Sequence, residues 1–234
     1  MEKIIYLLWR DPRQDATAFA DALRGQLAPA LHQVGARHLC LNLDDADVAT
    51  AASLRQKAFD VQPAAIAQVW VDSAITFLRR DIDAAIARYA ARHAAYLVTE
   101  SAAIVNREHP PQVGTRTFGF AQIAILRRPS RLSYGEWLDI WHNAHTKVGI
   151  ETQSNFEYRQ NVVVRPLSDD APAIDAFVEE CFPPDAMTDP HVFFDAVGDE
   201  AKFQRNLDAM MASVHRFIDM DAIDVVPTSQ YRMF

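Results

Sequence analysis

The sequence is poor in glycine and cysteine, with seven of the former and two of the latter in 234 residues. So few glycines leave little room for long flexible linkers. Cys40 and Cys181 are far apart and lie in apolar, strand-like surroundings. Such surroundings favour two reduced, buried core thiols over a disulfide framework. We therefore expect a cytoplasmic protein.

Basic residues and long apolar runs are also scarce. Lys and Arg number 23 against 31 Asp and Glu, which gives a formal net charge of −8. A nucleic-acid-binding protein needs a basic stripe to neutralise phosphates, and none is present. Anionic membrane surfaces are disfavoured for the same reason, and no apolar run approaches the ~18 residues that span a bilayer. We expect neither a nucleic-acid partner nor a membrane.

The order of sequence features indicates an internal repeat. A polar segment with two prolines and a glycine, residues 108–114, lies near the midpoint of the chain. The β-rich runs at residues 3–10 and 118–128 both lead into a proline, and a helix signal follows each. Asp15 is the expected N-cap of the first helix, and Ser133 opens an expected capping box in the second. This order predicts two units, residues 1–112 and 113–234.

Each unit continues with two strands, a second helix and a last strand. In the first unit we expect strands at 37–43, 64–71 and 96–105 and a helix at 82–94. In the second unit we expect strands at 156–164, 174–182 and 222–226 and a helix at 199–215. The predicted fold class is α+β, with two tandem ferredoxin-like βαββαβ units. A single doubly wound α/β domain is the alternative. Consecutive strands within each half and the lack of a glycine-rich phosphate loop argue against it.

Several motifs of the second half resemble the EthD-domain family. They are the strand, Arg-x-Pro turn and aromatic-then-histidine helix of residues 125–145, the Tyr-Arg-Gln-Asn of 158–161, the acidic strand 175–182, and the Phe-x-Asp of 217–219. The resemblance implies the dimeric α/β-barrel fold, in which the antiparallel sheets of two units pair into a barrel with helices outside. Here both units lie in one chain, which suits a monomeric pseudo-dimer or a homodimer. The first half matches in layout only.

The resemblance implies less about activity. EthD proteins are associated with degradation pathways and with pigment or polyketide biosynthesis. Relatives with the same barrel include polyketide cyclases, cofactor-free monooxygenases and muconolactone isomerases, and some relatives bind haem through a histidine. The fold alone does not choose among these activities.

A histidine interrupts the apolar stripe of the helix expected at 134–152. Helical spacing places Trp137, Trp141 and His145 on one stripe, with His142 at its edge. When the two helix N-caps are aligned, Leu27 of the first half matches His145. A ring that replaces leucine there must be hydrogen-bonded. A satisfied core histidine and a pocket histidine both remain open.

Two carboxylates share one face of the strand at 174–182. Asp175, Phe177 and Glu179 alternate to this face, and the carboxylates lie roughly 13 Å apart, too far for a catalytic dyad. Asp175 also fits a turn position at the start of the strand. Glu179 fits either a pocket role or an ion pair with Arg159 on a neighbouring strand.

We therefore expect one pocket, in the second half, for a small apolar or aromatic ligand. The expected function is a cofactor-independent lyase, dehydratase, cyclase or isomerase acting on an aromatic or polyketide-like molecule. The alternative is a non-catalytic ligand carrier of a degradation pathway. His145 is the expected acid or base, oriented by Tyr158 or Glu179. The expected substrate-binding residues are Trp141, Phe120, Phe177, Trp137, His142, Gln160 and Asp175.

No metal or other cofactor is expected. The sequence contains no HExxH motif, and the rings of His142 and His145 diverge on a helix. The matching cavity of the first half, lined by Phe19, Leu23 and Leu27, is expected to be filled by side chains because an all-apolar face closes like any core.

Overall fold

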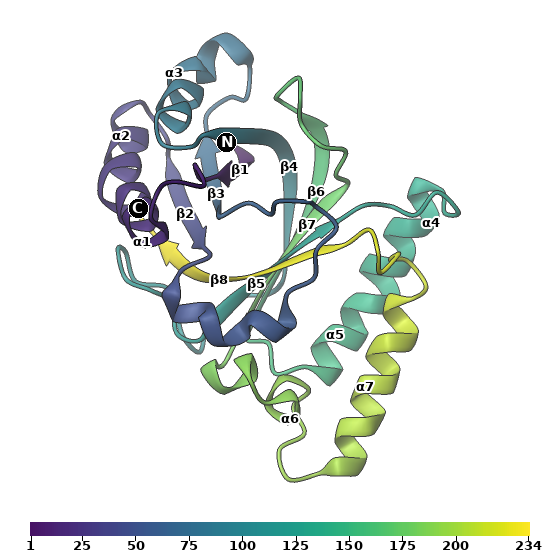
Figure 1. Cartoon of the computed structure of the whole chain (residues 1–234). Coiled ribbons are helices and arrows are strands. Elements are labelled where there is room, and N and C mark those ends of the chain that lie inside the picture. Colours follow the sequence, from purple (N-terminus) through teal and green to yellow (C-terminus); the bar gives the residue numbers. More distant parts are fainter.

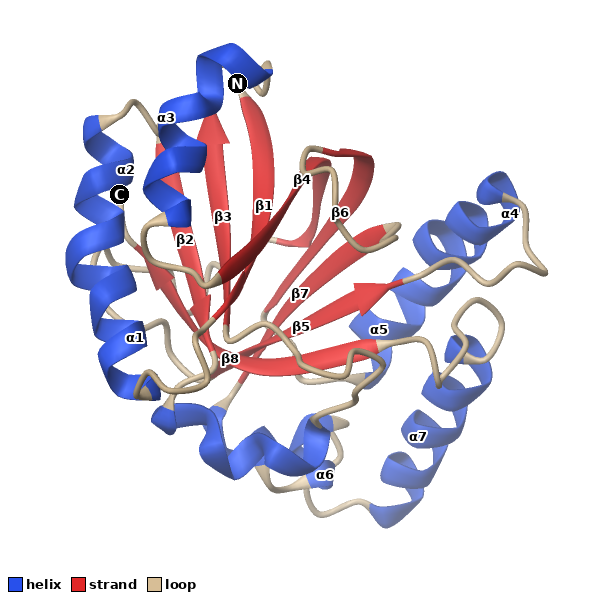
Figure 2. Cartoon of the chain, turned by 45° about the horizontal axis from the view of Figure 1, so that its top comes forward, coloured by secondary structure: helices blue, strands red, loops and turns tan.

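Eight antiparallel strands close into a barrel, and the helices lie outside it (Figures 1 and 2). The computed structural model describes all 234 residues, and the strand order around the barrel is β1-β3-β2-β8-β5-β7-β6-β4. The strands are β1 (Glu2–Trp9), β2 (His38–Leu43), β3 (Ala65–Val71), β4 (Arg92–Ile104), β5 (Phe120–Leu126), β6 (Glu157–Pro166), β7 (Ala176–Phe182) and β8 (Asp224–Arg232). The expected α+β class and the closed barrel are confirmed.

Two seams join the strands of the first half to those of the second. β2 pairs with β8, where Leu41 is opposite Tyr231. β4 pairs with β6 over a longer register that contains two irregularities. These seams leave no free sheet edge, which removes the usual template for aggregation.

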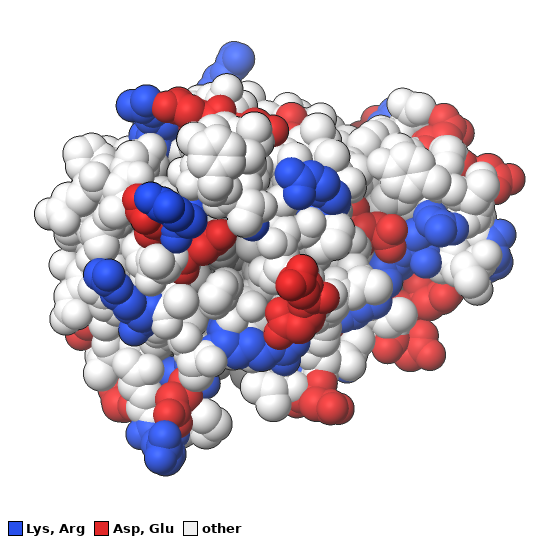
Figure 3. All heavy atoms as spheres, turned by 90° about the horizontal axis from the view of Figure 1, so that it is seen from above, with Lys and Arg blue, Asp and Glu red and all other residues white.

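The helices form two groups on the outside of the barrel. The first half supplies α1 (Ala16–Ala22), α2 (Ala28–Gln33) and α3 (Thr76–Ala87), and the second supplies α4 (Tyr134–Asp139), α5 (Thr146–Thr152), α6 (Pro190–Phe193) and α7 (Glu200–Val214). Figure 1 shows α1–α3 on one side and α4, α5 and α7 on another. No helix is long and apolar enough to cross a bilayer. On the face shown in Figure 3, basic and acidic side chains are interspersed.

The first long helix of each half is built in the same way. Asp15 caps α1 and the capping box of Ser133 opens α4, as expected. Each helix then passes through a π-helical turn, at Leu23–Leu27 (η1) and at Ile140–His145 (η3). The π turn is therefore a feature of both halves and does not mark a site by itself.

The second helix of the first half lies earlier than expected. It covers Thr76–Ala87 instead of residues 82–94, and β4 starts at Arg92. Its N-cap, Ile75, makes no side-chain hydrogen bond, so the usual polar start signal is missing. Three further helices were also not expected: the 3-10 helices η2 (Ala46–Leu54) and η4 (Pro184–Met187), and the short α-helix α6.

The helix–sheet layer of the first half is filled with apolar side chains. Phe19, Leu23 and Leu27 are all buried in one cluster of 24 core residues. The corresponding layer of the second half contains a cavity beside His145. The expected difference between the halves is therefore observed.

Gly119, which precedes β5, packs against the end of β7. Its φ is +74°, and a Cβ there would lie 1.9 Å from the carbonyl oxygen of Phe182. Gly114 has the same φ of +74° with open space around it. Gly119→Ala should therefore lose about 2–3 kcal/mol more stability in urea unfolding than Gly114→Ala, because only the former adds a clash to the backbone strain. Equal losses would contradict this packing.

Candidate functional site

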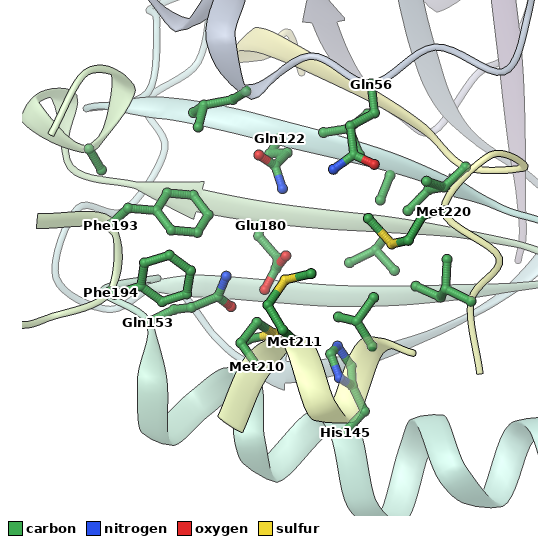
Figure 4. A pocket seen from close by; sticks show the side chains of 18 of the residues that line it. Gln56, Gln122, His145, Gln153, Glu180, Phe193, Phe194, Met210, Met211 and Met220 are labelled. Carbon is green, nitrogen blue, oxygen red and sulfur yellow. The ribbon is translucent and has the colours of Figure 1, made fainter. Parts of the chain in front are cut away.

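A cavity of about 460 Å³ lies between the second-half helices and the outer face of the sheet, and 18 of its 26 lining residues are hydrophobic (Figure 4). The floor comes from β5, β6, β7 and β8, and the walls come from η2, η3, η4, α6 and α7. A mostly apolar cavity of this size, with a few polar groups, is typical of a small-molecule site.

Methionine and phenylalanine make up much of the wall. Four of the six methionines line the cavity: Met187, Met210, Met211 and Met220. Phe193 and Phe194 close one end of the cavity in Figure 4. Methionine is flexible and polarisable, so such a wall can adapt to flat ligands of different outline.

His145 points into the cavity from η3 (Figure 4). Its Nδ1 lies 3.0 Å from the hydroxyl oxygen of Ser213 on α7, and its ring centroid is 4.7 Å from that of Phe217. Burial lowers the pKa of His145 to about 4. The ring is therefore neutral near pH 7, where it can form hydrogen bonds but is a weak base.

Glu180 is the carboxylate of this cavity. It lies on β7 opposite Gln122 of β5, and its Oε1 accepts a hydrogen bond of 2.8 Å from Nδ2 of Asn155. Burial raises the pKa of Glu180 to about 7. Because the folded chain holds this proton more tightly than the unfolded chain, Glu180 reduces stability as pH rises from about 4.5 to about 7.

Tyr158 of β6 presents a phenol to the same cavity. Its hydroxyl oxygen accepts hydrogen bonds from Nε1 of Trp141 and from Nε2 of Gln160, both 3.2 Å long. Burial, and next the charge of Glu180, raise the pKa of Tyr158 to about 12. The phenol therefore keeps its proton at neutral pH.

Of the expected catalytic residues, His145 and Tyr158 line one cavity and Glu179 lies elsewhere. Glu179 faces the inside of the barrel, where it accepts hydrogen bonds from the side-chain amides of Asn42, Gln68 and Gln230. Placing Glu179 beside His145 was wrong. Alternation along β7 separates its two faces correctly, but both faces are buried, so alternation cannot tell which one meets the helices.

The alternative left open for Glu179, an ion pair with Arg159, was also wrong. The guanidinium of Arg159 contacts Glu157 and Glu100 instead. Phe177, placed in the pocket wall by the sequence, lies inside the barrel with its ring centroid 5.3 Å from that of Tyr96.

The other expected binding residues divide between the cavity and its surroundings. Trp141 lines the cavity, and Gln160 contacts it through Tyr158. Trp137 packs behind Trp141, where its Nε1 donates to the Phe217 carbonyl.

Three more residues lie outside the lining. Phe120 stacks on Phe182 with 5.6 Å between the ring centroids. The ring of His142 packs against Trp141. Asp175 accepts a 2.7 Å hydrogen bond from the backbone N–H of Arg128, which is the turn role left open by the sequence.

Sequence reasoning missed Glu180, Gln122 and the methionine wall. Glu180 is adjacent to Glu179, and alternation along the strand places its side chain on the opposite face. A usable signal was present in the clustering of five of the six methionines after residue 186. Residues 184–199 carried no recognised element, yet they supply Phe193 and Phe194.

The cavity does not fit haem. None of its lining residues is Arg or Lys, so the haem propionates would find no basic partner, and Glu180 would repel them. The Nδ1 of His145 is also in hydrogen-bond contact with Ser213. Elsewhere, no group of three His, Cys, Asp or Glu side chains is arranged to hold a metal ion.

Comparison with known proteins reveals a shared fold. No protein-family model matches the sequence, and no curated protein matches it. Among solved structures, an anthrone oxidase-like protein is similar with a TM-score of 0.55 at 7% identity, over 99% of this chain and 93% of that one.

Two further structures are more distant. A candidate monooxygenase from Fusobacterium nucleatum has a TM-score of 0.48 at 10% identity, over 100% of this chain and 92% of that one. A candidate chlorite dismutase has a TM-score of 0.46 at 10% identity, over 97% and 95%. The chain therefore has the α/β-barrel fold of the anthrone oxidase-like protein.

Proposed function

We propose that the chain is an enzyme that removes a proton from a small aromatic or polyketide-like molecule held in the cavity of the second half. The observation that carries the proposal is Glu180, a half-buried carboxylate with a pKa of about 7 in the wall of a mostly apolar cavity. A base works best when its pKa lies near the operating pH, and burial tunes Glu180 to that range.

The polar groups of the cavity have different roles in the proposed reaction. Glu180 accepts the proton from an activated C–H or O–H of the ligand. Tyr158 already accepts two hydrogen bonds, so its own O–H can donate to the oxygen on which negative charge develops. Neutral His145 positions the ligand by hydrogen bonding, a change from the acid–base role expected from the sequence. The methionine and phenylalanine walls hold the flat apolar body.

Such a proton abstraction starts cyclase, dehydratase, lyase and isomerase reactions, and also oxidation by dioxygen without a cofactor. The anthrone oxidase-like neighbour makes anthrone a reasonable test substrate. In that reaction a methylene C–H gives its proton to Glu180, dioxygen takes up the electrons, and one anthrone and one dioxygen yield one anthraquinone and one water.

The strand order supports a finer assignment of the fold and family. The first half contributes β4-β1-β3-β2 as consecutive neighbours and the second contributes β8-β5-β7-β6, which is the arrangement of a ferredoxin-like unit repeated twice. We infer two such units, residues 1–112 and 113–234, and membership of the EthD-related barrels for the second.

The second candidate function is a non-catalytic carrier of the same kind of ligand. The four methionines of the wall favour it, because adaptable methionine surfaces suit binding of several related molecules. A carrier would bind anthrone without converting it, so the experiment below separates the two candidates.

Glu180→Gln should abolish anthrone turnover, with a loss of about 10²–10⁴-fold, because one proton-transfer group is removed. Binding followed by tryptophan fluorescence should persist, since the shape is kept. In the unmodified chain, turnover should fall as pH drops below about 7 and Glu180 becomes protonated. Glu151→Gln, an exposed change on α5, is the control and should leave turnover intact. A Glu180→Gln variant with full activity would refute the proposal.

His145→Leu reproduces the leucine of the first half and tests the Ser213 contact. The substitution should lose about 1–3 kcal/mol in urea unfolding, because it leaves the buried Ser213 hydroxyl without its partner. Adding Ser213→Ala should recover most of that loss. Strictly additive losses in the double variant would show that the contact contributes nothing to stability.

A further inference from the structure

A second cavity, of about 390 Å³, lies at one end of the barrel and plays no part in the proposed reaction. Strands of both halves line it: β2 and β3 from the first, and β6, β7 and β8 from the second. The linker between the halves also lines it through Asn106, Pro110 and Pro111. Only five of its 15 lining residues are hydrophobic, so it differs in character from the cavity beside His145.

Two buried oxygen atoms in this cavity lack a hydrogen-bond donor. They are Oε2 of Glu157 and Oε1 of Gln68, whose residues are 1% and 2% exposed. The amide orientation of Gln68 is fixed, because its Nε2 donates to Oδ1 of Asn42 at 2.8 Å and to Oε2 of Glu179 at 2.9 Å. The amide nitrogen of Asn106 donates one N–H to the His109 carbonyl, and Asn106 also lies close enough to Glu157 to lower the pKa of that carboxyl, but Oε2 of Glu157 is left without a partner. Both unpaired atoms are therefore acceptors.

The charges around these atoms do not balance. By formal count the cluster has three carboxyl groups, on Glu100, Glu157 and Glu179, against two basic groups, on Lys3 and Arg159. Lys3 contacts Glu100, and Arg159 contacts Glu100 and Glu157. Glu179 accepts hydrogen bonds from side-chain amides and contacts no basic group. Burial, and next the charge of Glu179, raise the pKa of Glu157. One more cation at this point would satisfy the cluster.

The mouth of the cavity has the opposite character from its interior. Trp70, Val105, Pro110, Pro111 and Phe234 are apolar lining residues that are exposed or half-buried, so we infer that they form its rim. The basic Arg232 is exposed there, where solvent screens its charge. A ligand that suits both parts has its charged end inside and an apolar body at the rim.

We propose that the barrel-end cavity binds a small organic cation, a primary ammonium on a short apolar body, whose N–H groups donate to Glu157 Oε2 with Gln68 Oε1 as a second acceptor. An anion would meet the unbalanced carboxylates. A bare metal ion would leave the apolar rim without a partner. An ammonium supplies three donors and one positive charge, which are the two things that the cavity lacks.

The test uses calorimetric titration of the full chain with 2-phenylethylamine, and with 2-phenylethanol as the neutral control of nearly equal shape. The amine should bind, and the alcohol should bind at least tenfold more weakly. Equal affinity for the two, or no binding of either, would overturn the proposal. This comparison needs no variant, so it remains decisive if a substitution in the buried cluster prevents folding.

Two variants locate the binding. Glu157→Gln should weaken 2-phenylethylamine binding at least tenfold, because it removes the charge and keeps the shape. Glu180→Gln, the same change in the other cavity, should leave amine affinity unchanged. The reverse pattern would contradict the assignment. Displacement of the amine by potassium chloride, but not by choline chloride, would show a metal-ion site instead and would also overturn it.

Discussion

Closure of the barrel across the β2–β8 and β4–β6 seams is the constraint on which the rest of the structure depends. A sheet with open edges can leave one face in water, but each strand of this closed barrel has an inner face and an outer face. Nearly every residue of β7 and β8 is buried, so both faces of these two strands are covered. Both cavities follow from this arrangement: one lies under the helices, and the other lies at one end of the barrel. Because both halves are in one chain, closure needs no second copy.

The two halves use the same scaffold for different purposes. Their long helices have matching N-caps and matching π turns, and Leu27 and His145 each end a π turn. In the first half this surface packs into the largest core cluster. In the second half His145 and Glu180 need polar partners, and the side chains around them do not close up. The first half therefore contributes stability and the second contributes the cavity.

The sequence allowed the strand and helix order, both N-caps and the placement of Trp141, His145 and Tyr158 to be predicted, because these depend on local signals and on helical spacing. The choice between Glu179 and Glu180 could not be made, since a strand buried on both sides gives no polar face as a reference.

Long-range contacts explain the other misses. The hydrogen bond from Gln68 to Glu179 joins residues 111 positions apart, and no local sequence pattern predicts such a contact. The cavity walls supplied by η2, η4 and α6 come from irregular segments whose position is set by the barrel and the helices around them. The start of α3 was missed because it lacks a polar cap.

The proposed function depends on a carboxylate in the second-half cavity that titrates near neutral pH and that an aromatic ligand covers. Carbon-13 NMR of the side-chain carboxyl of Glu180 measures this directly, with the signal assigned by its loss in Glu180→Gln. We expect a midpoint at about pH 7 in the free chain and a clear displacement of that midpoint when anthrone is added. A midpoint at the ordinary glutamate value of about 4.5, unchanged by anthrone, would contradict it.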